Sequence, residues 1–342
     1  MNSNKIIAII YALAAALFYA INVPCSKLLL NVVPPTLMAS FLYLGAGFGV
    51  GVMYLFHFGK EEKAERLSRK DLPYTVGMVV LDIIAPILLM LGVKIGTSAN
   101  ASLLGNFEIV ATSLIALFLF REKVSLRLWG AIALITFSSM ILTFDGSGSL
   151  RFSLGSLLVL GATACWGLEN NCTRSLSSKS TYEIVTIKGL FSGSGSLIVA
   201  LFLGEKIPVI SYILLVLLLG FVAYGLSIFT YIRAQKTLGA AKTSAYYAIA
   251  PFVGAFLSFV LLKEHLSTSY LIALIIMAFG TVLVILDTLL LRHNHEHSHA
   301  FTHFHNGVIH AHTIAHSHSH RHLINEDQHH HEHTVSELEN YL

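Results

Sequence analysis

Apolar segments long enough to cross a bilayer follow one another along most of the chain, separated by short polar stretches. A bilayer core of about 30 Å requires roughly 17 to 25 apolar residues per helix, and a helix pairs its own backbone polar groups. The pattern therefore predicts ten membrane-spanning helices. Their limits are Ile6–Leu30, Pro35–Phe58, Leu72–Val93, Ala99–Phe120, Leu126–Phe144, Phe152–Leu176, Tyr182–Leu203, Pro208–Ile232, Thr243–Leu262 and Ser267–Leu291.

This pattern occurs twice along the chain. Gly96–Ser125 returns as Gly239–Ser267, since both segments begin with small and hydroxylated residues, continue through a long apolar run and end in a charged cluster. A second match aligns Tyr19–Lys27 with Trp166–Arg174. The chain is therefore predicted to contain two five-helix repeats and a tail. Their limits are 1–145, 146–291 and 292–342.

Five helices per repeat bring the second repeat into the membrane from the opposite side. Inverted repeats of this kind are the architecture of many secondary transporters, whose substrate site lies near the midplane between the halves. A channel or an intramembrane enzyme could be built in the same way. Sixteen Lys and Arg residues fall on one side of the predicted membrane and five on the other, which predicts that both termini are cytoplasmic.

Composition supports an all-α polytopic membrane protein. The 342 residues are 55% hydrophobic and only 12% charged, too few charges for a soluble protein of this length. The net charge of +3 comes from scattered residues, so no nucleic-acid partner is expected. Three cysteines without CxxC spacing provide neither a disulfide framework nor a thiolate metal site. No phosphate-binding loop, HExxH or GxSxG motif is present, so no enzyme is predicted and no cofactor is required.

Charged residues inside a membrane are costly and are therefore candidates for function. Asp82, Glu108, Glu169 and Lys188 lie well inside the predicted spans, and Glu169 aligns with Asn22 of the first repeat. Such polar differences are expected where a symmetric cavity serves an asymmetric ligand. The alternative is a structural pairing of the carboxylates with Lys188. The predicted substrate-binding residues are Asn22, Asp82, Asn106, Glu108, Trp166, Glu169, Asn170, Lys188, Tyr246 and Tyr247.

Two further features concern helix packing and helix continuity. The small-residue runs Gly45–Gly51 and Ser192–Ser196 allow helices to approach closely. Pro24 and Pro251 interrupt helical hydrogen bonding and predict breaks in the first and ninth helices. A carboxylate such as Glu108 could also exchange a proton, which would couple transport to a proton gradient.

The tail is low in complexity and contains all but two of the 18 histidines. Asn306-Gly307 predicts a tight hairpin turn, with His303 opposite His310 and Phe304 opposite Ile309. Several imidazoles on one face could bind zinc, nickel, cobalt or copper, and pH sensing is the alternative. The predicted metal ligands are His303, His305, His310, His312, His316, His318, His320 and His322.

The fourth helix of each repeat ends in a charged cluster containing Glu, Phe120–Ser125 and Leu262–Ser267. With the two five-helix repeats over Ile6–Leu291, this pattern resembles the EamA family of the drug/metabolite transporter superfamily. The resemblance implies a carrier of the bacterial inner membrane, commonly an exporter of amino acids or other metabolites, with a central cavity between the halves.

The function predicted from the sequence is therefore a secondary transporter, an exporter of small organic metabolites such as amino acids, that works by alternating access and has a metal-binding regulatory tail. Its predicted partners are a small-molecule substrate and the lipid bilayer, with a divalent metal as a further candidate. Two alternatives stay open. One is an exporter of divalent transition metals, and the other is a metal- or pH-sensing membrane protein.

Overall fold

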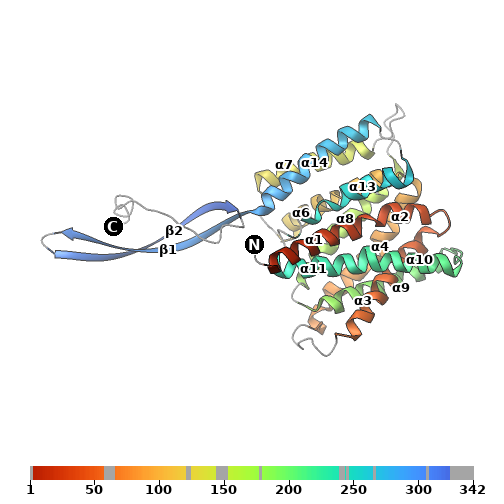
Figure 1. The fold of residues 1–342 in the computed structure, drawn as a ribbon, viewed down its shortest axis with the longest axis horizontal. Coiled ribbons are helices and arrows are strands. Elements are labelled where there is room, and N and C mark those ends of the chain that lie inside the picture. The colour runs from red at the N-terminus through yellow and green to blue at the C-terminus, as the bar shows by residue number, and fades with distance from the viewer. Residues whose placement is uncertain are drawn as a thin grey trace. The chain divides into compact units, whose positions relative to one another are not determined.

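The structure is a computed structural model that describes residues 3–57, 66–120, 125–143, 153–176, 179–238, 243, 246–264, 267–305 and 308–323. It divides into two compact units, Met1–Ile285 and Leu286–Leu342. In its described residues, the first unit is a bundle of helices that lie side by side (Figure 1). The second contains a two-stranded β-hairpin.

Each predicted span is mainly helical in its described residues, except that turns interrupt the first, fourth and ninth spans and the last two residues of the tenth, Leu290 and Leu291, belong to the strand β1 (Leu290–His305). The helices are α1 (Ser3–Ala20), α2 (Asn22–Leu29), α3 (Pro35–Leu55), η3 (Arg69–Asp71), α4 (Leu72–Ile95), α5 (Ser98–Leu104), α6 (Phe107–Phe120), α7 (Leu126–Thr143), α8 (Leu154–Ser175), α9 (Thr181–Phe202), α10 (Ile210–Gly220), the π-helical turn η4 (Phe221–Leu226), α11 (Ser227–Leu238), α13 (Ala250–Leu262) and α14 (Thr268–Leu289).

Seven continuous helices among the described residues are long and apolar enough to cross a membrane. They are Asn4–Leu29, Pro35–Leu55, Arg69–Ile95, Leu126–Thr143, Thr181–Phe202, Ile210–Gln235 and Thr268–Asp287. The other three predicted spans correspond to the divided pair α5 and α6, to α8, which carries several polar residues, and to the short α13. The count of ten spans therefore stays a prediction.

Helix breaks fall in the turn before each of the two prolines, as predicted for the first and ninth helices. The first break is at Ile21, and Pro24 lies in the first turn of α2. Pro251 is likewise the second residue of α13. Proline lacks an N–H group and is tolerated in the first turn of a helix, where that group has no helical acceptor. Another break, at Gly105-Asn106 between α5 and α6, involves no proline.

Corresponding helices of the two halves pack against each other in opposite directions. The backbone N–H of Ser98, at the start of α5, donates to Glu264, just beyond the end of α13 (2.8 Å). The N–H of Leu37, at the start of α3, donates to Glu205, beyond the end of α9 (2.8 Å). The Ser138 hydroxyl, late in α7, donates to the carbonyl of Ala273, early in α14 (2.7 Å). Antiparallel packing of corresponding helices is what an inverted repeat requires.

The small-residue runs lie where helices approach most closely. A Cβ at Gly189 of α9 would collide with the backbone of Gly47 in α3, and a Cβ at Gly47 would collide with the backbone of Leu190. Only glycine leaves room for these two backbones, which agrees with the packing role predicted for the run in α3.

The hairpin consists of β1 (Leu290–His305) and β2 (Val308–Leu323), which pair in antiparallel register. His303 is opposite His310 and Phe304 is opposite Ile309. The proposed turn residues Asn306 and Gly307 lie outside the described residues. Histidine also faces histidine further along the ladder, at 293 and 320, 295 and 318, and 297 and 316.

Candidate functional site

Three charged residues from three helices form an ion cluster inside the helical bundle. The Lys188 Nζ atom of α9 lies 3.0 Å from Asp82 Oδ2 of α4 and 3.0 Å from Glu169 Oε1 of α8. Asp82 is fully buried, and the residues Glu169 and Lys188 are only 2% and 9% exposed. The sequence alternative, in which these carboxylates pair with Lys188, describes this contact correctly. The pairing does not exclude a functional role, because a buried charge is retained at a cost.

Hydroxyl groups complete the ion cluster. Tyr43 Oη of α3 donates to Asp82 Oδ1 (2.9 Å), and the Thr173 hydroxyl donates to Glu169 Oε1. The sequence analysis did not select either residue. Thr173 could have been found, because it follows Glu169 by four residues and so lies one helical turn away. Tyr43 stands in an apolar run that carries no sign of its hydroxyl's partner.

A hydrogen-bonded group around the Glu108 carboxylate adjoins the ion cluster. Asn170 Nδ2 donates to Glu108 Oε1 of α6 (2.6 Å) and to the hydroxyl of Thr112 (3.3 Å). Asn170 follows Glu169 directly in α8, so the two polar groups share one helix turn. The structure thus gathers five of the predicted site residues around the C-terminal part of α8, namely Asp82, Glu108, Glu169, Asn170 and Lys188.

Asn22 belongs to a neighbouring hydrogen-bonded group. Its Nδ2 donates to the hydroxyl of Tyr224 in η4 (3.0 Å), and its Oδ1 accepts from the Ser26 hydroxyl (3.1 Å). The ring of Tyr224 lies against those of Tyr43 and Tyr19, with centroids 5.1 and 6.0 Å apart. Aromatic rings therefore connect Asn22 to the ion cluster.

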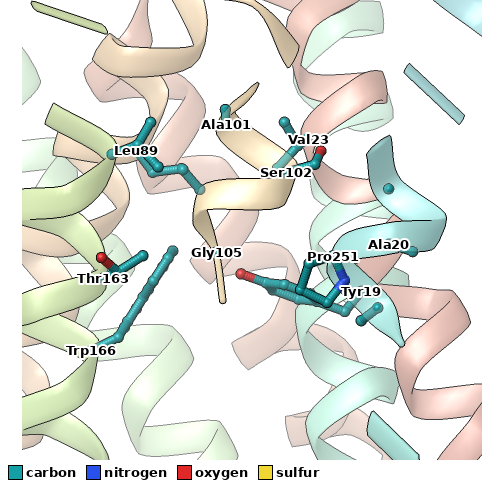
Figure 2. Close-up of a pocket in the computed structure, with 13 residues that line it drawn as sticks. Tyr19, Ala20, Val23, Leu89, Ala101, Ser102, Gly105, Thr163, Trp166 and Pro251 are labelled. Carbon is teal, nitrogen blue, oxygen red and sulfur yellow. The ribbon is translucent and has the colours of Figure 1, made fainter. Parts of the chain in front are cut away.

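A small cavity lies beside these groups, and Figure 2 shows Tyr19 of α1 and Trp166 of α8 entering it from opposite sides. The repeat aligns these two residues with each other. The cavity has a volume of about 20 Å³, which is room for roughly one water molecule. The remaining lining residues are Ala20, Val23, Leu89, Ala101, Ser102, Gly105, Val159, Thr163, Ala250, Pro251 and Gly254.

Two acidic residues come one helical turn after residues that line the cavity. Glu169 comes three residues after Trp166 in α8, and Glu108 comes three residues after Gly105 at the break before α6. Residues three apart on a helix are neighbours on its surface. The cavity therefore has aromatic walls, two carboxylates lie one turn beyond its lining residues, and its volume fits about one water molecule.

Other predicted residues lie near this region without contacting the ion cluster in the described hydrogen bonds. Asn106 is buried and donates to the carbonyl of Leu103 (3.3 Å), whereas its own Oδ1 has no partner. The ring of Tyr247 lies 5.9 Å from that of Tyr19. Tyr246 is half-buried. The eight predicted metal ligands all lie in the hairpin strands, in the other unit.

Metal binding has little support in the helical unit. The described part of the chain presents no group of three or more His, Cys, Asp or Glu side chains placed to hold a metal ion. The site instead combines carboxylates, an amine, hydroxyls, amides and aromatic rings. That mixture suits an organic solute held by apolar walls and a few directed polar contacts.

Comparison with known proteins identifies a family and similar proteins. The model of the EamA-like transporter family matches residues 6–144 and 153–286. An uncharacterized transporter of Methanothermobacter thermautotrophicus is 26% identical over 296 residues, covering 80% of this chain and 84% of that protein. A solved crystal structure is similar with a TM-score of 0.60 and 20% identity, covering 82% of this chain and 96% of that one. This last likeness concerns the fold.

Proposed function

Because the chain belongs to the EamA-like transporter family and is a multi-pass membrane protein, we propose that it is a secondary transporter that exports small organic metabolites such as amino acids. The observation that carries the proposal is the cluster of Asp82, Glu169 and Lys188 beside an aromatic-walled cavity. Charged groups at membrane depth mark substrate or ion pathways. Here they come from α4 of the first half and from α8 and α9 of the second.

Alternating access between two inverted five-helix halves is the proposed mechanism, with ten spans in all. Antiparallel contacts between corresponding helices support it. The packing of α1 on α11 also repeats in the packing of α8 on α4, where each helix is replaced by its counterpart from the other half. The cavity beside Trp166 holds only about one water, so a larger substrate requires its walls to move apart. Breaks at Ile21 and Gly105-Asn106 supply places where the helices bend.

The proposed location is the bacterial inner membrane with both termini in the cytoplasm. The excess of Lys and Arg in the loops on one side supports this orientation. The His-rich tail would then face the cytoplasm.

For the tail we propose regulation by a bound divalent metal such as zinc, nickel, cobalt or copper. In the hairpin register, His303 is opposite His310, and strand alternation puts the paired histidine positions on one face. Zinc titration of the full chain should show saturable binding, and His303→Ala with His310→Ala should weaken it. Equal zinc binding by the wild type and the double variant would show that these two residues are not metal ligands.

Transport in proteoliposomes tests the main proposal. The full chain should exchange a labelled amino acid across the membrane faster than protein-free liposomes, and Glu169→Gln should abolish that exchange. Asp71→Asn is the matched control, because it removes a carboxylate at the edge of the membrane that pairs with Lys179 (3.4 Å). If a broad panel of metabolites is not moved by the wild type, the transporter proposal is wrong.

A second candidate is export of divalent transition metals, and the paired histidines of the hairpin favour it. Cells that express the full chain would then retain less zinc than cells without it, and the eight histidine substitutions would cancel the difference. Unchanged zinc content together with altered amino-acid release would leave only the organic-solute proposal.

A further inference from the structure

The buried polar region has more negative than positive groups. Asp82, Glu108 and Glu169 contribute three carboxyl groups, and within the described residues both ion pairs of these groups are made by Lys188. One amine cannot neutralise three carboxylates. Because uncompensated charge inside a membrane is costly, the excess carboxyl groups must either take up protons or pair with positive charge from outside the protein.

Glu108 and Glu169 are the carboxylates nearest to the cavity along their helices. Each follows a cavity-lining residue by one turn, Gly105 and Trp166 respectively. Glu108 lies partly accessible, and its hydrogen bond from Asn170 uses only its Oε1 atom. A ligand in an enlarged form of this cavity would therefore meet two carboxylates at its end.

The cavity walls suit a cation as well. Tyr19 and Trp166 face each other across it, and the rings of Tyr224 and Tyr247 pack against Tyr19. The faces of aromatic rings attract organic cations. Ser102 adds a polar atom, because this residue lines the cavity and its buried Oγ has no hydrogen-bond partner among the described residues. It could accept a hydrogen bond from an ammonium group.

Fewer groups near the cavity suit a negative group on the ligand. Helix N-termini at breaks can bind carboxylates, but an N–H group in the first turn of α6 and one in the first turn of α13 already donate to the preceding backbone. Glu108 N donates to Gly105 O, and Phe252 N donates to Ile249 O, each at 3.1 Å. Lys188 is occupied by two carboxylates.

We propose that the transported substrate carries a net positive charge: an organic amine, or an amino acid with a cationic side chain. Its ammonium or guanidinium group contacts Glu108 and Glu169, and its apolar part lies between Tyr19 and Trp166. This inference rests on the proposed transport function and names its substrate class.

Intrinsic fluorescence can report binding at this place. The chain has two tryptophans, Trp166 in the cavity wall and Trp129 on the exposed surface of α7, so Trp129→Phe leaves a single reporter. The full chain with this substitution, in nanodiscs of uncharged lipid, is titrated with phenethylamine, phenylacetate and 2-phenylethanol. These probes have similar shapes and differ in charge.

Phenethylamine should change the Trp166 emission in a saturable manner, whereas the anion and the alcohol should not at the same concentration. In the Trp129→Phe background, Glu169→Gln and Glu108→Gln should each weaken the binding tenfold or more. Glu169→Asp, which keeps the charge, should retain most of it and guards against loss through misfolding. Asp71→Asn should have no effect. Equal responses to all three probes, or full binding by both Gln variants, would overturn the inference.

A transport measurement separates this inference from the function on which it rests. Proteoliposomes with the wild-type chain are given labelled arginine, leucine or glutamate, and arginine should be exchanged at least tenfold faster than glutamate. Exchange of leucine or glutamate without arginine would leave a transporter but refute the cationic substrate. Saturable phenethylamine binding without exchange of any solute would instead refute transport and keep the cation site.

Discussion

Asn22 with Ser26 in α2 and Glu169 with Thr173 in α8 occupy matching positions of the two repeats. Both pairs form the same contact, in which a hydroxyl donates to a side-chain oxygen four residues earlier. The first acceptor is a neutral amide and the second is a carboxylate paired with Lys188. Local geometry has thus been kept while the charge has changed.

The difference indicates how one duplicated framework could hold an asymmetric ligand. Corresponding helices of the two halves also pack against each other, as α3 does on α9 and α5 on α13. In the core, by contrast, the neutral group of Asn22 and Tyr224 stands where its counterpart carries Glu169. The repeats thus share a framework, and their unequal cores give chemical specificity.

The largest expected effect comes from removing the Lys188 amine from the ion cluster. Lys188→Met should lower the free energy of unfolding by about 3–5 kcal/mol, because Asp82 and Glu169 then stay buried without their cation. Thermal unfolding in detergent measures it. Adding Asp82→Asn to Lys188→Met should recover part of the loss, since one buried charge is removed. A double variant no more stable than the single one would contradict the assigned charge balance.

The matched hydrogen bonds are expected to differ in strength. Thr173→Val should cost about 1.5–3 kcal/mol, because its acceptor Glu169 is charged, and Ser26→Ala should cost about 0.5–1.5 kcal/mol, because its acceptor Asn22 is neutral. Both are measured by chemical or thermal unfolding of the purified chain. Equal losses would mean that the charge difference between the halves has no energetic consequence at these positions.

Much of this difference between the repeats could be predicted from the sequence alone, for a physical reason. A bilayer requires long apolar helices, so the spans can be read locally, and a carboxylate such as Glu169 stands out against them. Aligning the repeats also exposed the mismatch between Asn22 and Glu169. The ion pairing of Lys188 was foreseen only as the alternative to function.

Other features depend on tertiary packing and leave no local signal. Tyr43 and Tyr224 look like ordinary apolar-span residues, yet their hydroxyls bind Asp82 and Asn22. The break at Gly105-Asn106 lacks a proline, and the π-helical turn Phe221–Leu226 has no composition that distinguishes it from its neighbours. Which helix faces meet is decided by the whole bundle rather than by any one segment.

Gly189, at the contact between α3 and α9, can be used to test the close packing between the two halves. Gly189→Ala should destabilise the protein by about 1–3 kcal/mol, because the added methyl group meets the backbone of Gly47. Gly51→Ala is the control, since its Cβ would only touch the Thr186 side chain at an ordinary 3.4 Å. That variant should be neutral or slightly stabilised, as alanine favours helix. Unfolding temperatures of the two variants in one detergent compare them directly.

The smallest effects are expected at the helix ends, where two glutamates of the second half cap helices of the first half. Glu205→Ala and Glu264→Ala each remove a carboxylate that accepts two backbone N–H groups, at the starts of α3 and α5 respectively. Loss of a helix cap costs about 0.5–2 kcal/mol. The two variants should therefore unfold at similar temperatures, and their losses should add in the double variant because the caps lie on different helices. Since each glutamate makes the same two contacts to a helix start, a large loss in one variant alone would show that its carboxylate does more than cap a helix.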